Sequence, residues 1–193
     1  MKIRCNEKVH IMTDATTEDV VQAIQVLLGT RHYFSHLIID GKEVTQLTDT
    51  MDFTTVEEIE VITITAQAFI TDLLTSITDY LQHALPKLAV VTERFMQGTA
   101  NADQWQGLSD LFESAQWLHQ ANDVITASEV CPPAWHESQA PLNMLTVGLP
   151  LFEAPLREEN QQKIANLLKV NVIPAFEQLL QVAKSSMPTS NHN

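Results

Sequence analysis

The sequence predicts an α+β protein, with a small mixed domain over residues 1–65 and an all-α helical bundle over residues 66–185. Apolar residues in the first third of the chain alternate with polar ones, as they do in half-buried strands. After residue 65 they recur every three or four residues, which is typical of amphipathic helices packed against one another. The last residues, 186–193, are mostly small and polar and predict a disordered tail.

The first domain begins with a predicted β-hairpin and a helix. Apolar side chains alternate on either side of a turn at residues 6–7, namely Ile3, Cys5, Val9 and Ile11. A helix is expected next, because Thr16 or Thr17 can act as its N-cap and two acidic residues follow where the helix dipole favours negative charge. Gly29 is expected to end this helix.

Three further strands complete the domain in the order β-β-α-β-β-β. Residues 36–39 and 42–44 are expected to pair through a tight turn at Asp40-Gly41, a dipeptide that readily adopts the positive φ angles of such turns. After a polar stretch, residues 59–64 are rich in β-branched side chains and predict the closing strand.

These features together resemble the ubiquitin-like β-grasp family. The chain starts Met-Lys-Ile, continues through a hairpin into a helix opened by Thr-x-x-Val, and reads Leu-Ile-Ile-Asp-Gly-Lys-Glu-Val over residues 37–44. The resemblance covers the first third of the chain and implies a β-grasp fold used for contact with other proteins. Ubiquitin ends in a free Gly-Gly used for conjugation, whereas residue 64 here runs directly into Thr65-Ala66-Gln67, so covalent tagging is not implied.

The predicted bundle contains long amphipathic helices and one proline-rich connection. The first helix is expected over residues 66–98, with a kink or restart at Pro86, and a loop follows at residues 99–103. The second has an apolar face rich in aromatic residues from Trp105 to Ile125.

Prolines shape the expectations for the rest of the chain. Five of the eight prolines lie within residues 128–155, so only a short helical turn is expected there, near residues 142–149. The last helix is expected to start near Pro155, with a kink at Pro174.

The charge balance limits the classes of partner. Eleven basic residues face 24 acidic ones, which gives a formal net charge of −13 without any cluster of Lys and Arg, so nucleic-acid binding is not expected. Membrane insertion is not expected either, since no apolar run approaches the roughly 20 residues of a spanning helix. Cys5 and Cys131 form no C-x-x-C pair, and the chain starts without an apolar signal segment, so a cytoplasmic location is expected.

Two pairs of residues are weak candidates for metal binding or catalysis. His32 and His36 are four residues apart, but the preceding helix is expected to end before them and no third ligand lies close in sequence. Cys131 and His136 lie in one short segment, where an imidazole could activate a thiolate, although its two prolines and a tryptophan fit a packed loop equally well. No cofactor is expected.

Two tryptophans are the candidate partner-binding residues. Trp117 lies beside the apolar stripe of the second helix, and Trp135 lies in the proline-rich connection, so both are candidates for exposed anchors at an interface. We therefore expect a non-enzymatic adaptor or assembly protein that binds a protein partner or itself. The alternative is a small-molecule- or metal-binding helical bundle, or an enzyme that uses Cys131 and His136.

Overall fold

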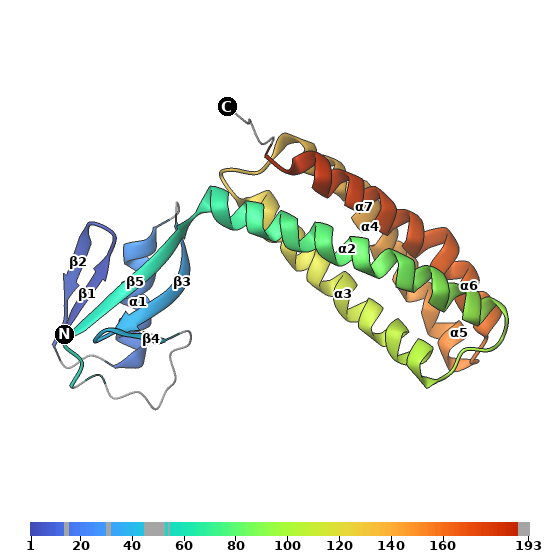
Figure 1. The fold of residues 1–193 in the computed structure, drawn as a ribbon, viewed down its shortest axis with the longest axis horizontal. Coiled ribbons are helices and arrows are strands. Elements are labelled where there is room, and N and C mark those ends of the chain that lie inside the picture. Colours follow the sequence, from blue (N-terminus) through green and yellow to red (C-terminus); the bar gives the residue numbers. More distant parts are fainter. Residues whose placement is uncertain (14–15, 30–31, 45–52, 54, 189–193) are drawn as a thin grey trace. The chain divides into compact units, whose positions relative to one another are not determined.

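A computed structural model describes residues 1–13, 16–29, 32–44, 53 and 55–188. The chain divides into two compact units, Met1–Phe69 and Ile70–Asn193. The predicted α+β class is confirmed, because a five-stranded mixed sheet precedes a largely helical region (Figure 1). The predicted disordered tail lies outside the described residues from residue 189 onward.

The sheet of the first unit has the strand order β2-β1-β5-β3-β4. At its centre, β1 (Lys2–Cys5) pairs in parallel with β5 (Glu58–Thr65). On one side, β1 pairs antiparallel with β2 (Lys8–Ile11). On the other side, β3 (His32–Ile39) pairs antiparallel with both β5 and β4 (Lys42–Val44). The strands β2 and β4 are therefore the two edges.

The helix α1 (Thr17–Leu28) covers one face of this sheet. Thr16 caps it, since its side-chain oxygen accepts the Asp19 amide at 3.3 Å while the Asp19 carboxylate accepts the Thr16 amide at 2.9 Å. The buried residues of α1 and of the sheet, together with Phe53 before β5, form one apolar core: Ile3, Cys5, Val20, Ala23, Ile24, Leu37, Phe53, Ile59 and Val61. Alternate strand residues, such as Arg4 and Glu60, lie on the other face and form an ion pair at 3.2 Å.

The third strand is longer than the sequence predicts. It was expected to begin at residue 36, whereas β3 begins at His32. The ring of Tyr33 stacks on the ring of Phe69 in the first turn of α2, with centroids 4.3 Å apart. This contact joins residues far apart in sequence and holds the added residues in place, and a bulge follows between Phe34 and His36.

The second unit consists of helices joined by short turns (Figure 1). The helix α2 begins within the first unit, directly after β5, and continues into the second. The bounds of the helices are α2 (Ala66–Met96), α3 (Ala102–Ala127), η1 (Pro133–Ser138), α4 (Gln139–Gly148), η2 (Leu149–Phe152), α5 (Glu153–Arg157), α6 (Gln161–Leu167), η3 (Leu168–Val172) and α7 (Ile173–Ser186).

Prolines interrupt these helices less than the sequence predicts. The helix α2 continues through Pro86 without a break. The connection over residues 128–155 contains more than the single turn we expected, because Pro133, Pro141 and Pro150 lie in the first turns of η1, α4 and η2. A backbone amide in a first turn has no partner within the helix, so proline costs little there.

The last helical region is divided, where one helix was expected. A helix does lie at Pro155, but this is the short α5, which ends at Arg157, and α6 begins separately at Gln161, where the Asn160 side chain accepts the Lys163 amide at 3.0 Å. Directly before Pro174 the chain forms the π-helical turn η3. Proline has no amide hydrogen to donate, and the wider i→i+5 hydrogen bonding of a π turn tolerates the missing bond.

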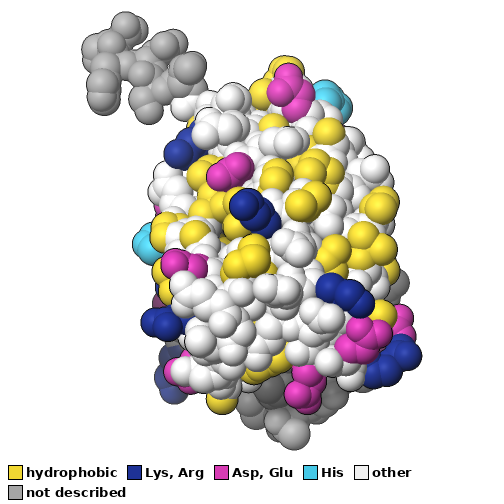
Figure 2. Space-filling view, turned by 90° about the vertical axis from the view of Figure 1, so that its right-hand side faces the viewer, with side chains coloured by type: hydrophobic (Ala, Val, Ile, Leu, Met, Phe, Trp, Pro, Cys, Tyr) yellow, Lys and Arg dark blue, Asp and Glu magenta, His cyan; other side chains and the backbone are white. Residues whose placement is uncertain are grey.

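In the described part of the chain, no helix combines the length and the apolar character needed to cross a bilayer. Figure 2 shows one face of the molecule, on which apolar side chains lie among charged side chains of both signs. On this face the net charge of −13 is therefore not gathered into a single acidic surface.

Candidate functional site

A groove with a volume of about 260 Å³ lies between α2 and α3 in the second unit. The two helices follow one another through a short turn in which Gly98 adopts a positive φ of 69°. Small residues on both walls, Ala84 on α2 and Gly107 on α3, leave space between the helices. The lining residues are Tyr80, His83, Ala84, Lys87, Leu88, Val91, Gly107, Asp110, Leu111 and Phe176.

Apolar side chains from three helices form the floor of this groove. Leu88 from α2, Leu111 from α3 and Phe176 from α7 are all more than nine-tenths buried. The ring of Phe176 also meets the ring of Tyr80 edge to face, with centroids 6.3 Å apart. Because three helices contribute, the floor exists only in the folded bundle.

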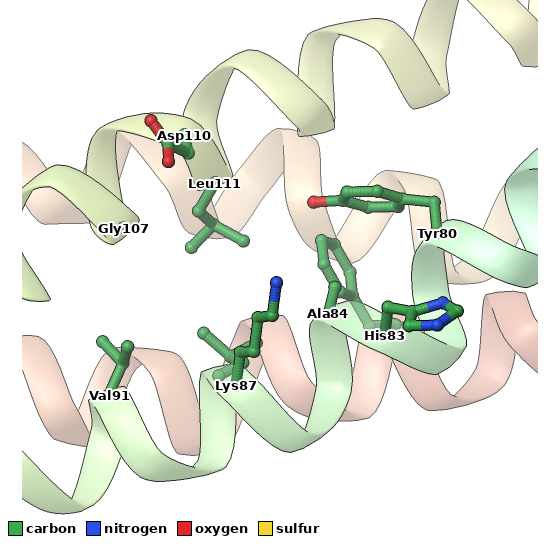
Figure 3. A pocket seen from close by; sticks show the side chains of 10 residues that line it. Tyr80, His83, Ala84, Lys87, Val91, Gly107, Asp110 and Leu111 are labelled. Carbon is green, nitrogen blue, oxygen red and sulfur yellow. The ribbon is translucent and has the colours of Figure 1, made fainter.

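Charged and polar side chains border the groove. Figure 3 shows Lys87 rising from α2 into the space between the helices, with Leu111 opposite it on α3. Asp110 lies on the α3 wall and accepts a hydrogen bond from Gln106 at 2.8 Å. On the α2 wall, Nδ1 of His83 lies 2.6 Å from the carbonyl oxygen of Asp79 within its own helix. The α2 wall thus carries a cation and the α3 wall an anion.

A second, more open hollow continues the groove along the same two helices. It shares Tyr80 and Asp110 with the first and is also lined by Ser76, Glu113, Ser114 and Trp117. The half-buried ring of Trp117 meets the edge of Tyr80, with centroids 5.7 Å apart. From Ser76 to Val91 the two hollows follow α2 for about 22 Å, at 1.5 Å per residue.

The surroundings of Tyr80 in the groove perturb the ionisation of its phenol. Burial raises the pKa of Tyr80 above its ordinary value, and the nearby negative charge of Asp110 raises it further. A hydrogen bond with Ser114 opposes these effects. The phenol is therefore protonated at neutral pH and can donate a hydrogen bond at the middle of the groove.

The size and lining of the groove limit what it can hold. The hollow between Ala84 and Gly107, at 260 Å³, falls below the range of about 300 to 1,000 Å³ typical of pockets for small molecules and cofactors, and the adjoining hollow at Trp117, at about 480 Å³, is wide open to solvent. The smaller hollow suits one large apolar side chain, with Lys87, Asp110 and the Tyr80 hydroxyl available to polar groups around it.

The two tryptophans predicted as partner-binding anchors differ in their exposure to solvent. Trp117 is half-exposed and lies in the groove. Trp135 is only 1% exposed, so the expectation that it is an exposed anchor is wrong. Its segment is the 3₁₀ helix η1, which packs against α3 and α7, and its indole N–H donates to Asn122 at 3.2 Å. A buried partner for the polar end of the ring allows the whole side chain to be buried.

His32 and His36 do not converge on a common site. Both lie on β3, where His32 pairs with Thr65 and His36 with Ile62. Thr65 and Ile62 are three residues apart on β5, so the bulge between the histidines places them on opposite faces of the sheet. Two side chains on opposite faces cannot ligate one ion.

Cys131 and His136 show no sign of an activated thiol. Burial raises the pKa of the Cys131 thiol, which disfavours the thiolate that a nucleophile or metal ligand needs. Its sulfur contacts the carbonyl oxygen of Pro132 at 3.7 Å, and the His136 side chain is exposed in the last turn of η1. Among the described residues, His, Cys, Asp and Glu side chains form no group of three that could hold a metal ion.

Sequence reasoning missed most of the groove. Tyr80, Lys87 and Asp110 are ordinary residues of amphipathic helices, and only the packing of α2 on α3 brings them together. Gly107 offered one local signal, because an isolated glycine inside a helix usually has a packing or functional reason.

Comparison with known proteins places this groove in a recognised family region. Residues 72–182 match the model of a family described as "Domain of unknown function (DUF8042)", and all groove residues from Ser76 to Phe176 lie within that stretch. No curated protein and no solved structure matches the chain.

Proposed function

We propose that this chain, which belongs to the DUF8042 family of domains of unknown function, is a non-enzymatic adaptor or assembly protein. In this proposal the groove between α2 and α3 holds a large apolar side chain of a protein partner. The observation that carries it is an open groove with an apolar floor, bordered by the exposed charges Lys87 and Asp110 and by Trp117.

The arrangement of the groove matches the anatomy of interface hot spots. Such sites have a desolvated apolar centre, aromatic side chains and a polar rim that excludes water. Here Phe176 and Leu111 provide the apolar centre, while Tyr80 and Trp117 provide aromatic surface next to it. The oppositely charged walls would orient the bound segment, since its charged groups can meet Lys87 on one side and Asp110 on the other.

We also propose that the first unit is a ubiquitin-like β-grasp module and serves as a second contact element of the adaptor. The sheet order β2-β1-β5-β3-β4, with a parallel pair at its centre and α1 on one face, supports this assignment. An experimental structure with a different strand order would remove it.

The first experiment identifies the partner from within the groove. A photo-cross-linking amino acid is placed at His83 or at Glu113, which are exposed on opposite walls, and at the 66%-exposed Val170 as a control. Irradiation in the cells that express the chain, followed by mass spectrometry, should give the same cross-linked protein from both groove positions. Equal yields from position 170 would contradict binding in the groove.

The second experiment measures binding of the identified partner to groove variants. A Cβ atom built on Gly107 meets only a side-chain carbon of Val91, at 3.8 Å, so α3 can accept a side chain there. Gly107→Met then fills the groove, and we expect the dissociation constant from calorimetry to rise about tenfold or more, which corresponds to about 1.4 kcal/mol.

Gly107→Ala is the matched control, because it adds a single methyl group and should leave most of the groove open. Trp117→Ala should also weaken binding by removing aromatic surface at the groove. A folded Gly107→Met variant that binds the partner as tightly as the unmodified chain would show that the groove does not hold it.

A further inference from the structure

The edge strand β2 is exposed along its whole length. Two of its four residues are large and apolar, with Val9 51% exposed and Ile11 77% exposed. In the part of the chain that the structure describes, β2 pairs with β1 alone. An exposed apolar edge is a template for pairing with another strand.

The pairing of β1 with β2 shows which backbone groups of β2 are free. Met1 and Met12 exchange both of their backbone hydrogen bonds, each at 3.0 Å. In an antiparallel pair, positions bonded in this way alternate with positions that are not. Counting along the register, Val9 and Ile11 fall at the unbonded positions, so their N–H and C=O groups point away from β1 to the outer edge.

We propose that β2 pairs antiparallel with β2 of a second copy of this chain, across a two-fold axis at His10. Val9 of each copy then lies opposite Ile11 of the other, and each such pair exchanges both of its N–H···O bonds. The arrangement is self-complementary, as a two-fold interface requires. It uses the outward-facing backbone groups of both copies and joins their two sheets into one.

The side chains of β2 fit this register on both faces of the sheet. On the face away from α1, Val9 and Ile11 of the two copies form a cluster of cross-strand apolar pairs. On the face toward α1, Lys8 of each copy lies opposite Met12 of the other. Met12 lines a groove of about 240 Å³ on this face, so the side chain of Lys8, whose ammonium donates to the Leu27 carbonyl oxygen of its own copy at 3.2 Å, lies across from this groove of the other copy.

The charge of the chain sets the strength of this dimer. Pairing over one short strand buries little area compared with permanent dimers, so a reversible dimer is expected. Each copy also carries a net charge of −13, and the long-range repulsion between two copies opposes association. Added salt screens that repulsion and should strengthen the dimer, whereas it would weaken binding of a basic partner at the same edge.

Sedimentation equilibrium of the full chain, from micromolar to millimolar concentration, measures this association. We expect a monomer–dimer equilibrium whose dissociation constant falls as salt is added. Ile11→Pro removes an outward-pointing N–H and leaves the bonds between β1 and β2 in place, because proline is tolerated at such an edge position. Ile11→Lys places a charge in the apolar cluster, and each variant should weaken the dimer about tenfold or more.

Val170→Lys is the matched control, because Val170 is 66% exposed and belongs to η3 of the helical unit rather than to the sheet. It should dimerise like the unmodified chain. Circular dichroism confirms that each variant is folded, and Ile11→Lys keeps the proposal testable if Ile11→Pro disturbs the strand.

Hydrogen exchange locates the contact independently. The amides of Val9 and Ile11 should exchange rapidly in dilute solution and more slowly as the concentration rises, while the amide of His10 is protected at all concentrations by its bond to β1. A chain that stays monomeric to millimolar concentration, or a dimer that is indifferent to Ile11→Lys, would overturn the proposal. So would protection of Val9 and Ile11 that appears only when a different protein is added.

Discussion

The indole nitrogen of Trp135 donates a hydrogen bond to the side-chain oxygen of Asn122, 3.2 Å away, inside the helical unit. The same oxygen accepts bonds from the hydroxyl groups of Ser138 at 3.0 Å and Thr126 at 3.4 Å. One buried amide of α3 therefore fixes η1 and Trp135 against the bundle.

Replacing Asn122 should destabilise the bundle more than its small apolar contact area suggests. Asn122→Ala leaves the Trp135 N–H and the Ser138 hydroxyl buried without a partner. We expect a loss of about 2 to 3 kcal/mol in the free energy of unfolding, measured with urea. The control is Gln120→Ala, an exposed change on the same helix that should cost less than about 0.5 kcal/mol. Equal losses would show that the hydrogen bonds of Asn122 contribute nothing.

The two tryptophans should behave in opposite ways. Trp135→Ala empties a fully buried site and should cost about 3 to 5 kcal/mol of unfolding free energy. Trp117→Ala removes a half-exposed ring and should cost about 1 kcal/mol, while it weakens binding at the groove. Urea denaturation of both variants tests this order, and a larger stability loss for Trp117→Ala would contradict the burial of Trp135.

Local sequence signals were sufficient for much of the first unit. The hairpin around residues 6–7, the Thr16 cap and the Asp40-Gly41 turn depend on neighbouring residues, and each is present in the structure. The start of β3 could not be predicted in this way, because its first residues are held by Tyr33 stacking on Phe69.

The burial of Trp135 and the lining of the groove depend on tertiary packing, which local sequence signals do not show. The sequence around Trp135 is typical of a loop and does not show that Asn122 provides a buried partner for its N–H. Likewise, Lys87 and Asp110 become groove residues only because α2 and α3 pack side by side. The sequence predicts Trp117 as a partner-binding anchor, which stays a prediction, and it does not reveal that the ring packs on Tyr80.

Two helical glycines should respond oppositely to alanine. At Gly107 the added Cβ meets only Val91, at 3.8 Å, so Gly107→Ala should raise the unfolding free energy by about 0.8 to 1 kcal/mol through helix propensity. At Gly148 a Cβ would lie 2.9 Å from Cβ of Asn171, closer than carbon atoms can approach. Gly148→Ala should therefore destabilise by about 1 to 3 kcal/mol. Thermal unfolding of both variants measures the difference, and a stabilised Gly148→Ala variant would refute the close packing of α4 on η3.

The stability of the helical unit should fall in alkaline solution partly because of Tyr80. Burial raises the pKa of this phenol, with a further contribution from Asp110 and an opposing one from Ser114. A group whose pKa is higher in the folded than in the unfolded state stabilises the fold fully below its unfolded pKa, about 10 for tyrosine, and loses that contribution as the pH rises through the folded pKa. Tyr80→Phe cannot ionise, so the free energy of unfolding should decline less above pH 10 than in the unmodified chain. Urea denaturation across this pH range measures the slope of the unfolding free energy against pH for both proteins.

Tyr33→Phe, a change in the other unit, controls for the loss of a tyrosine. Equal slopes in the Tyr80→Phe variant and the unmodified chain would show that the phenol ionises as freely in the groove as in water.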